Sequence, residues 1–213
     1  MKHLLRIRVH PYVTTVAPLE RDAELMLRVQ EGDDSSFALL LEKYRNPVIH
    51  FLYRMVQNQA IAEELAQEVF LRVYRSRASY EPTARFTTWL FRITTHLALN
   101  HIRDRRKHQL LTPIDSPSET FTSIQLADKE LTSEQRLLMQ ARLAEVRRAI
   151  EQLPEKQRSA VLMHKYQEMD YSQIAGALSC SEAAVKSLLF RAYESLRARL
   201  KHFSPGGIGK KLD

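Results

Sequence analysis

The sequence has few of the residues that a disulfide-bonded, β-rich or membrane-anchored protein needs. Cys180 is the only cysteine, so neither an intramolecular disulfide nor a cysteine cluster for zinc can form. Strand-type alternation is nearly absent outside the N-terminal tail, and apolar residues recur mostly at helical spacing. No apolar run approaches the ~18–20 residues that span a bilayer, and Arg6, Arg8 and Pro11 interrupt any signal-type segment. We expect an all-α, cytoplasmic protein with neither a bound metal nor a cofactor.

Acidic residues are outnumbered, with 25 Asp and Glu against 32 Lys and Arg, and the formal net charge is +7. The excess is uneven along the chain. Residues 1–105 carry 15 basic and 12 acidic residues, residues 106–134 carry 3 and 5, and residues 135–213 carry 14 and 8. Two basic blocks therefore flank an acidic connector, which favours a polyanionic partner.

The helical patterns begin after a loose basic tail at residues 1–19. Gly32 is placed to end a first helix, and Asp33, Asp34 or Ser35 can cap the next one. Pro47 lies inside that second pattern, so we expect a kink or break near Asn46. A strongly amphipathic helix follows at residues 60–77, with acids near its start and an apolar stripe formed by Ile61, Leu65, Val69 and Val73.

The stretch from Tyr80 to Lys107 combines aromatic and basic residues on a loop and a long helix. Phe86, Leu90, Ile93 and Leu97 recur at helical spacing and predict a core-facing stripe. Aromatic faces stack on unpaired bases and basic groups hold phosphate, so the exposed side of this helix could bind nucleic acid. The alternative is a core helix with a solvated basic end. These helices predict a first domain at residues 20–107.

Residues 108–132 contain two prolines, several Ser and Thr and scattered acids, and they predict a flexible linker. Fully extended, these residues would reach about 80 Å at ~3.3 Å each, so two modules could bind separated sites on one duplex. Thr132 and Gln135 have the spacing of a capping box that starts a second domain at residues 133–201. Its first helix carries a continuous apolar seam of Met139, Leu143, Val146, Ile150 and Leu153. Residues 202–213 form a C-terminal tail, whose glycines and lysines resemble a phosphate loop only in composition.

The second domain contains the pattern of a helix-turn-helix. Asp170 and Gln173 form a second capping-box pair, Ser179 and Cys180 make a tight turn, and Ser181 can cap the next helix. The apolar positions of the two helices are Ile174, Ala175, Leu178, Val185, Leu189, Ala192 and Leu196. The N-terminal residues of the second helix would enter the major groove, with outward positions at Glu182, Ala183, Lys186 and Ser187. Arg191, Arg197, Arg199 and Lys201 suit phosphate, and a plain helical hairpin with basic solvated faces is the alternative.

Three stretches resemble one known family. The segments at residues 62–75 and 86–93 and the helix-turn-helix that ends at residues 185–187 are similar to bacterial sigma factors of the extracytoplasmic-function (ECF) group, in the sigma-70 family. The resemblance covers about residues 20–201. It implies a region 2 domain at residues 20–107 and a region 4 helix-turn-helix domain at residues 133–201. It also implies an RNA polymerase specificity subunit that directs initiation at particular promoters.

The resemblance further implies partners and site residues. Region 2 would dock on the β′ clamp helices of core RNA polymerase through Leu65, Gln67, Glu68 and Phe70. It would bind the −10 element through Tyr80, Arg85, Phe86, Trp89, Arg92, His96, Asn100 and Arg103, although Phe86 and Trp89 could equally belong to the core. Region 4 would read the −35 element through Glu182, Ala183, Lys186, Ser187 and Arg191, and would contact the β flap. An anti-sigma factor that holds the two domains together is a further implied partner, and no small-molecule substrate is implied.

The sequence departs from the family pattern at several positions. Many relatives carry Arg-Asn where Thr95 and His96 stand, Gly at Ser179, and Arg at Leu188. They usually have Gly-Thr at residues 183–184, which are both alanine here. Two other functions remain open: an autonomous helix-turn-helix regulator with residues 20–107 as a sensor or dimerisation domain, and a nucleic-acid-processing enzyme. The second would need clustered carboxylates for a metal, and the acids of this sequence are scattered.

Overall fold

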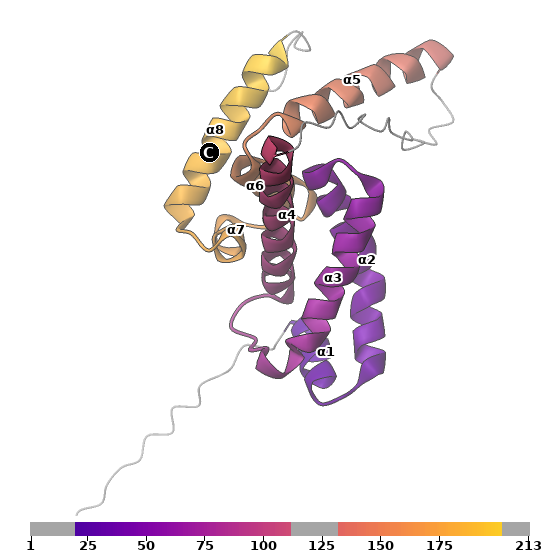
Figure 1. Cartoon of the computed structure of the whole chain (residues 1–213), viewed down its shortest axis with the longest axis vertical. Helices are drawn as coiled ribbons and strands as arrows, with labels where there is room; N and C mark the ends of the chain where they lie inside the picture. Colours follow the sequence, from indigo (N-terminus) through magenta and orange to yellow (C-terminus); the bar gives the residue numbers. More distant parts are fainter. Residues whose placement is uncertain (1–19, 112–131, 202–213) are drawn as a thin grey trace, which may run out of the picture.

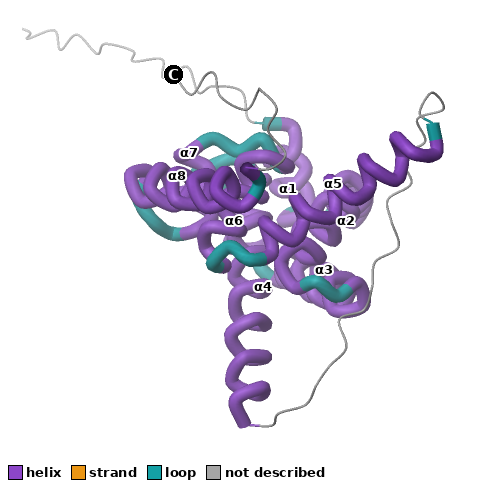
Figure 2. The backbone as a smooth tube through the Cα atoms, turned by 90° about the horizontal axis from the view of Figure 1, so that it is seen from above, coloured by secondary structure: helices purple, strands orange, loops and turns teal. Residues whose placement is uncertain are grey.

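The computed structural model describes residues 20–111 and 132–201 and contains helices and loops without a β-strand in those ranges (Figures 1 and 2). This confirms the expected all-α fold. The helices are α1 (Arg21–Gln30), α2 (Asp34–Val56), α3 (Gln59–Arg75), a short 3₁₀ turn η1 (Arg77–Ser79), α4 (Phe86–Leu111), α5 (Ser133–Glu151), α6 (Glu155–Tyr166), α7 (Tyr171–Leu178) and α8 (Glu182–Arg199).

The first domain consists of α1 to α4, packed around a core of aromatic and aliphatic side chains. Phe51 on α2 and Phe91 on α4 lie edge to face with ring centroids 5.3 Å apart. The predicted helix ends between α1 and α2 are confirmed: Gly32 has a φ of +98° and Asp33 caps α2 through Ser35 and Ser36. The stripe predicted for α4 is buried at Phe86, Leu90 and Leu97 and half-buried at Ile93.

A kink or break was predicted near Asn46, and the break is wrong, because α2 continues through Pro47 to Val56. Proline removes one backbone donor and crowds the preceding turn, which favours a break in an isolated helix. Here Tyr44, Val48 and Phe51 are buried on either side of it. The packing of this apolar face therefore holds the helix together through the proline.

A buried carboxylate joins α1 to α2. Asp22 is 4% exposed and accepts hydrogen bonds from the Tyr44 hydroxyl at 2.5 Å and from Lys43 Nζ at 2.6 Å. Burial raises the pKa of Tyr44, and the hydrogen bond to Asp22 raises it further. The hydroxyl therefore stays protonated near neutral pH and donates its hydrogen bond to Asp22.

We predict that Asp22→Ala lowers the free energy of unfolding of the first domain by about 1–3 kcal/mol, because the Tyr44 hydroxyl remains buried without an acceptor. Urea unfolding followed by circular dichroism would measure the change. Glu24→Ala, an exposed acid in the same first turn of α1, is the matched control and should have a small effect. Equal losses for the two variants would show that the Asp22 contacts contribute nothing of their own.

The second domain consists of α5 to α8 and has the predicted helix-turn-helix. Both predicted capping boxes are present, at Thr132 with Gln135 and at Asp170 with Gln173, and Ser181 caps α8. The turn is made by Ser179, which adopts the left-handed conformation at φ 51° where glycine would be unstrained. Leu188 is half-buried and packs against the core, which explains an apolar residue at that position.

The seam predicted along α5 is only partly buried. Leu153 is buried and Val146 and Ile150 are half-buried, but Met139 and Leu143 are exposed. Figures 1 and 2 show the N-terminal half of α5 extending away from the other helices. Leu137 and Leu138 are exposed there as well, so this half of the helix presents an apolar surface.

The two domains lie against each other. Helix α4 is placed between α2 and α3 on one side and the helices of the second domain on the other (Figure 1), with α7 packed on α4 and α6 packed on α2. Helix α4 also continues to Leu111, four residues beyond the predicted domain end at Lys107. Residues 112–131 of the predicted linker and the two predicted tails lie outside the described residues.

Candidate nucleic-acid interface

One side of α4 carries most of the residues expected to bind the −10 element. Trp89, Arg92, His96, Asn100 and Arg103 are three or four residues apart and therefore share one helix face, which we call the α4 strip. Three of them, Arg92, His96 and Arg103, are exposed, and the other two are half-buried. Among the described residues Arg92 has no ion-pair partner, so its guanidinium is available to a phosphate group.

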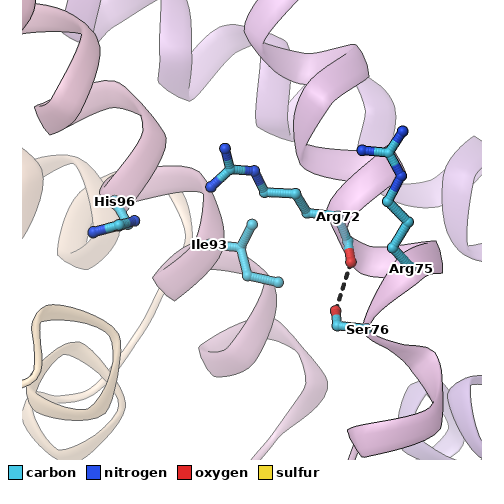
Figure 3. Close-up of a pocket in the computed structure, with 5 residues that line it drawn as sticks. All are labelled: Arg72, Arg75, Ser76, Ile93 and His96. Carbon is cyan, nitrogen blue, oxygen red and sulfur yellow. Dashed lines mark hydrogen bonds between the residues drawn. The ribbon is translucent and has the colours of Figure 1, made fainter.

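An open pocket lies beside this strip, between α3 and α4 (Figure 3). It has a volume of about 390 Å³ and is lined by Arg72, Arg75 and Ser76 from the end of α3 and by Ile93 and His96 from α4. Arg72 reaches across the space above Ile93, in the direction of His96. The Nε of Arg72 donates to Glu68 at 2.7 Å. Arg75 adds a second positive charge to the pocket lining, and His96 adds ring nitrogens that can form hydrogen bonds. This pocket can receive an anionic group or an extruded nucleotide beside the α4 strip.

Arg72 and Arg75 were not among the residues predicted for DNA, because the sequence assigned their helix to polymerase docking. They come from α3, and only the folded chain places them beside His96. In the sequence, the only indication that these two arginines contact DNA was their spacing of three residues at the end of a helix.

The aromatic residues predicted to stack on bases are mostly part of the core. Tyr80 is 3% exposed and Phe86 is completely buried, and their rings pack with Trp89 at centroid distances of 4.9 and 5.9 Å. Burial raises the pKa of Tyr80 to about 12. Neither Tyr80 nor Phe86 can stack on a base in this arrangement, so the alternative left open for Phe86 is the one observed. Trp89 is half-buried, and Arg85 is exposed in the loop that enters α4.

Helix α8 presents the predicted −35 residues together on its outer face. Glu182, Ala183, Lys186, Ser187 and Arg191 are all exposed, whereas Val185, Leu189 and Ala192 are buried against the domain. Lys186 Nζ lies 5.8 Å from the centroid of the Tyr171 ring on α7, which holds the ammonium group near the start of the helix. The arrangement matches a recognition helix whose first turns face base edges.

Phe190 belongs to the same face and was missed by the sequence analysis. It is 68% exposed, four residues after Lys186 and next to Arg191. An exposed aromatic ring on a recognition helix can contact a thymine methyl group. Marking the outward positions on a helical wheel would have found it. Of the predicted phosphate residues, Arg197 pairs with Glu194, Arg199 bonds Gln152, and Lys201 is exposed.

The residues expected to dock on polymerase lie on α3 with different exposures. Gln67 is exposed and Leu65 and Glu68 are half-buried, but Phe70 is buried in the core of the first domain. Phe70 therefore supports the fold in this arrangement and offers little surface to a partner. Leu71, beside it, is exposed and continues the accessible surface of α3. The first turn of α3 contains no acid, so the carboxylates lie one turn later than the sequence suggested.

A half-buried histidine on α6, His164, joins this helix to α7 and α8. His164 Nδ1 lies 2.9 Å from the Tyr193 hydroxyl on α8, and the ring stacks on Tyr171 of α7 at 5.8 Å. Burial lowers the pKa of His164 below its ordinary value of 6.5, and the neighbouring Lys165 lowers it further. The folded domain thus favours the neutral ring.

We predict that acidification destabilises this domain through His164. Because the unfolded histidine binds its proton at a higher pH than the folded one, stability is complete above about pH 6.5 and falls as the pH drops below that value. The loss from this group ends once the pH is below the folded pKa. Urea unfolding at pH 7.5, 6.5 and 5.5 should therefore show a flatter pH dependence for His164→Asn than for the unmodified chain. The exposed His50→Asn should leave the dependence unchanged, and an unchanged slope in both variants would contradict the prediction.

None of the helices described has the length and apolar character that crossing a bilayer requires. The described residues also contain no group of three or more His, Cys, Asp or Glu side chains placed to hold a metal ion.

Comparison with known proteins identifies both domains. Residues 40–108 match Sigma-70 region 2, and residues 143–196 match Sigma-70, region 4. RNA polymerase sigma-H factor of Pseudomonas aeruginosa is 31% identical over 183 residues, which cover 85% of this chain and 95% of that protein. ECF RNA polymerase sigma-E factor of Escherichia coli K12 is 32% identical over 177 residues, which cover 82% of this chain and 92% of that protein.

Two solved structures share the fold. CnrH in complex with the cytosolic domain of CnrY has a TM-score of 0.64 and 19% identity, covering 87% of this chain and 100% of that one. The sigma factor RpoE with the anti-sigma factor NepR from Bartonella quintana has a TM-score of 0.62 and 20% identity, covering 78% of this chain and 96% of that one. The chain belongs to the ECF group of the sigma-70 family, the RNA polymerase sigma factors that direct promoter-specific transcription initiation.

Proposed function

We propose that the α4 strip and the adjoining pocket capture the −10 element as its strands separate. The observation that carries this proposal is the alignment of Arg92, His96 and Arg103 on one exposed face, beside a pocket lined by Arg72 and Arg75. Unpairing a few base pairs costs a few kcal/mol, and it is offset when extruded bases gain stacking and phosphates gain cationic partners. Trp89, which is half-buried, supplies the aromatic surface, while Tyr80 and Phe86 are buried and hold the fold behind it.

The proposed −35 reader is the outer face of α8. Lys186 donates to acceptors on a guanine, Glu182 accepts from a cytosine amino group, and Phe190 contacts a thymine methyl. Arg191 and Lys201 hold the backbone phosphates on either side of the groove. The specificity of the domain thus resides in the first three turns of one helix.

The proposed polymerase contact is the outer surface of α3, formed by Leu65, Gln67, Glu68 and the exposed Leu71. Carboxylate and amide groups there suit the basic surface expected of the β′ clamp helices. The exposed apolar half of α5 suits a second apolar contact, with the β flap or with an anti-sigma factor. One structural neighbour, the sigma factor RpoE, was solved in complex with the anti-sigma factor NepR.

The proposed activity is the binding of core polymerase and promoter DNA in the cytoplasm, without a catalytic residue, a cofactor or a small-molecule substrate. Transcription by purified core polymerase from genomic fragments tests it directly. Adding the chain should produce run-off transcripts with defined start sites. The absence of any promoter-dependent transcript, together with tight binding of the free chain to a palindromic duplex, would instead support an autonomous helix-turn-helix regulator.

A further inference from the structure

Helix α1 contacts both ends of the segment that connects η1 to α4. At one end, Gln30 Nε2 donates to the Ala78 carbonyl in η1 at 2.8 Å. At the other end, Glu20 Oε2 accepts a hydrogen bond at 3.2 Å from the backbone N–H of Phe86, the first residue of α4. Glu20 immediately precedes α1, and Gln30 is the last residue of this helix. One helix thus joins the two ends of the segment, and Figure 1 shows α1 at the end of the domain where α4 begins.

The start of α4 depends on Glu20 because the residue that precedes the helix cannot cap it. Arg85 provides its carbonyl, which accepts from the N–H of Thr88 at 3.0 Å, but its guanidinium group only donates hydrogen bonds. The first N–H groups of a helix have no partner within the helix, and a negative charge near them is stabilising. The first turn of α4 contains no acid, so the carboxylate of Glu20 supplies both the acceptor and the charge. A residue outside the segment therefore fixes the direction in which the chain enters α4.

The residues between these two contacts are exposed. Tyr80 is buried and its ring packs on Trp89 with centroids 4.9 Å apart, whereas residues 81–85 are all exposed. Burial raises the pKa of Tyr80, and the negative charge of Glu20 raises it further, as expected when this carboxylate lies near the buried ring. The segment thus has fixed ends and an exposed middle, which finishes at Arg85.

A fixed backbone favours DNA binding through Arg85. This residue directly precedes the hydrogen-bonded N–H of Phe86, so the contact with Glu20 restricts the backbone from which the arginine side chain extends. Ordering a loop at the moment of binding costs conformational entropy, and a loop that is already ordered loses less. Without these contacts, the arginine would be spread over several positions and would bind a phosphate group less well.

We propose that Glu20 and Gln30 are positioning residues for capture of the −10 element. They hold residues 79–85 from both ends, so that Arg85 is presented to promoter DNA beside the α4 strip. Both residues act through Arg85 and make no DNA contact of their own. The proposal rests on the proposed function of the α4 strip, whereas the anchoring of the segment by α1 is measured in the free chain.

Fluorescence of Trp89 measures the anchoring, because Trp89 is the only tryptophan of the chain and lies in the first turns of α4. In the full chain, Glu20→Ala and Gln30→Ala should each increase the quenching of this fluorescence by acrylamide. The reason is that Tyr80 then packs less tightly on the indole ring. Glu20→Gln keeps a side-chain oxygen that can accept the hydrogen bond, so its quenching should match that of the unmodified chain, as should that of the control Glu24→Ala, an exposed acid on α1. Unchanged quenching in both Glu20→Ala and Gln30→Ala would overturn the anchoring.

Promoter opening by the holoenzyme, measured through the permanganate reactivity of unpaired thymines, tests the effect on capture. Glu20→Ala and Gln30→Ala should each reduce opening about three- to tenfold, as expected for the loss of one hydrogen bond. Assembly with core polymerase should stay unchanged, and Glu20→Gln should restore most of the opening. Gln30 is exposed, so Gln30→Ala tests the proposal without loss of a buried contact. Normal opening in both alanine variants would overturn the proposal. Increased opening in Glu20→Ala would also overturn it, because the carboxylate would then only repel DNA.

A double-mutant cycle separates positioning from a general loss of stability. Arg85→Ala removes the group that is positioned, so adding Glu20→Ala or Gln30→Ala to it should cause little further loss of opening. Losses that multiply in the double variants would overturn the proposal, because the two residues would then act independently of Arg85. If the unmodified chain gives no promoter-dependent transcript with core polymerase, the proposed function fails, and the fluorescence result still decides whether α1 anchors the segment.

Discussion

Replacing Arg92 and His96 together with alanine should reduce promoter opening by the holoenzyme about 10- to 100-fold while leaving its assembly with core polymerase unchanged. Each residue is exposed on the α4 strip, so the fold does not depend on it. Removing a phosphate contact and a base contact, at about 0.7–1.4 kcal/mol each, accounts for this range because 1.4 kcal/mol is a factor of ten.

Permanganate reactivity of unpaired thymines would measure opening, and competition for labelled core polymerase would measure assembly. The matched control is Arg45→Ala with His50→Ala, an exposed Arg and His on α2 of the same domain. This control should open promoters normally. If opening and assembly fall together in the Arg92 and His96 variant, the assignment of the α4 strip to DNA is wrong.

The second large effect is expected on the recognition helix. Lys186→Ala should weaken holoenzyme binding to its best −35 sequence about 5- to 100-fold and relax selectivity at one base pair, because a base-edge contact contributes about 1–3 kcal/mol of discrimination. Phe190→Ala should weaken binding by a similar factor with no change in salt dependence, since the lost contact is apolar.

Binding isotherms over a salt series, with duplexes substituted at each −35 position, separate these outcomes. Lys156→Ala, an exposed lysine on α6 away from the recognition face, is the control for charge. If Lys186→Ala instead weakens all sequences equally and reduces the salt slope by about one, Lys186 contacts phosphate and reads no base. Normal binding by Phe190→Ala would exclude the thymine contact.

Local features of the fold were predictable from the sequence because their causes are local. The capping boxes, the cap of α2 and the apolar stripe of α8 depend on residues within one or two turns, and all are observed. The continuity of α2 through Pro47 was not predictable, because it depends on partners from other helices. The exposure of Leu143 has the same origin. A periodic pattern predicts that one face of a helix is apolar, but it does not predict which other helix, if any, packs on that face.

Prediction of the candidate site from the sequence was limited in the same way, because contacts between helices decide which residues are exposed. Composition placed basic and aromatic residues near α4, but only the fold distinguishes Trp89, which is half-buried, from Phe86, which is completely buried. The contribution of Arg72 and Arg75 requires α3 and α4 to be adjacent, and no spacing along the chain encodes that. Domain docking was missed for a related reason. A connector rich in Ser, Thr and Pro was taken to mean that the two domains move independently. Gly176 and Arg158, which lie outside the connector, form a contact between the domains that its composition does not predict.

The buried hydroxyl groups of Thr88 and Thr95 on α4 have no hydrogen-bond partner among the described residues, which has a consequence for how the two domains pack. Valine has nearly the shape of threonine and lacks the hydroxyl, so a single substitution at either position would stabilise the packing of α7 on α4 by about 1–3 kcal/mol. A methyl group at residue 176 on α7 would have the opposite effect, because it would lie 3.0 Å from Thr88 Cγ2. Substitution at these positions therefore changes how tightly the two domains pack, while the residues that face outward on α8 stay the same.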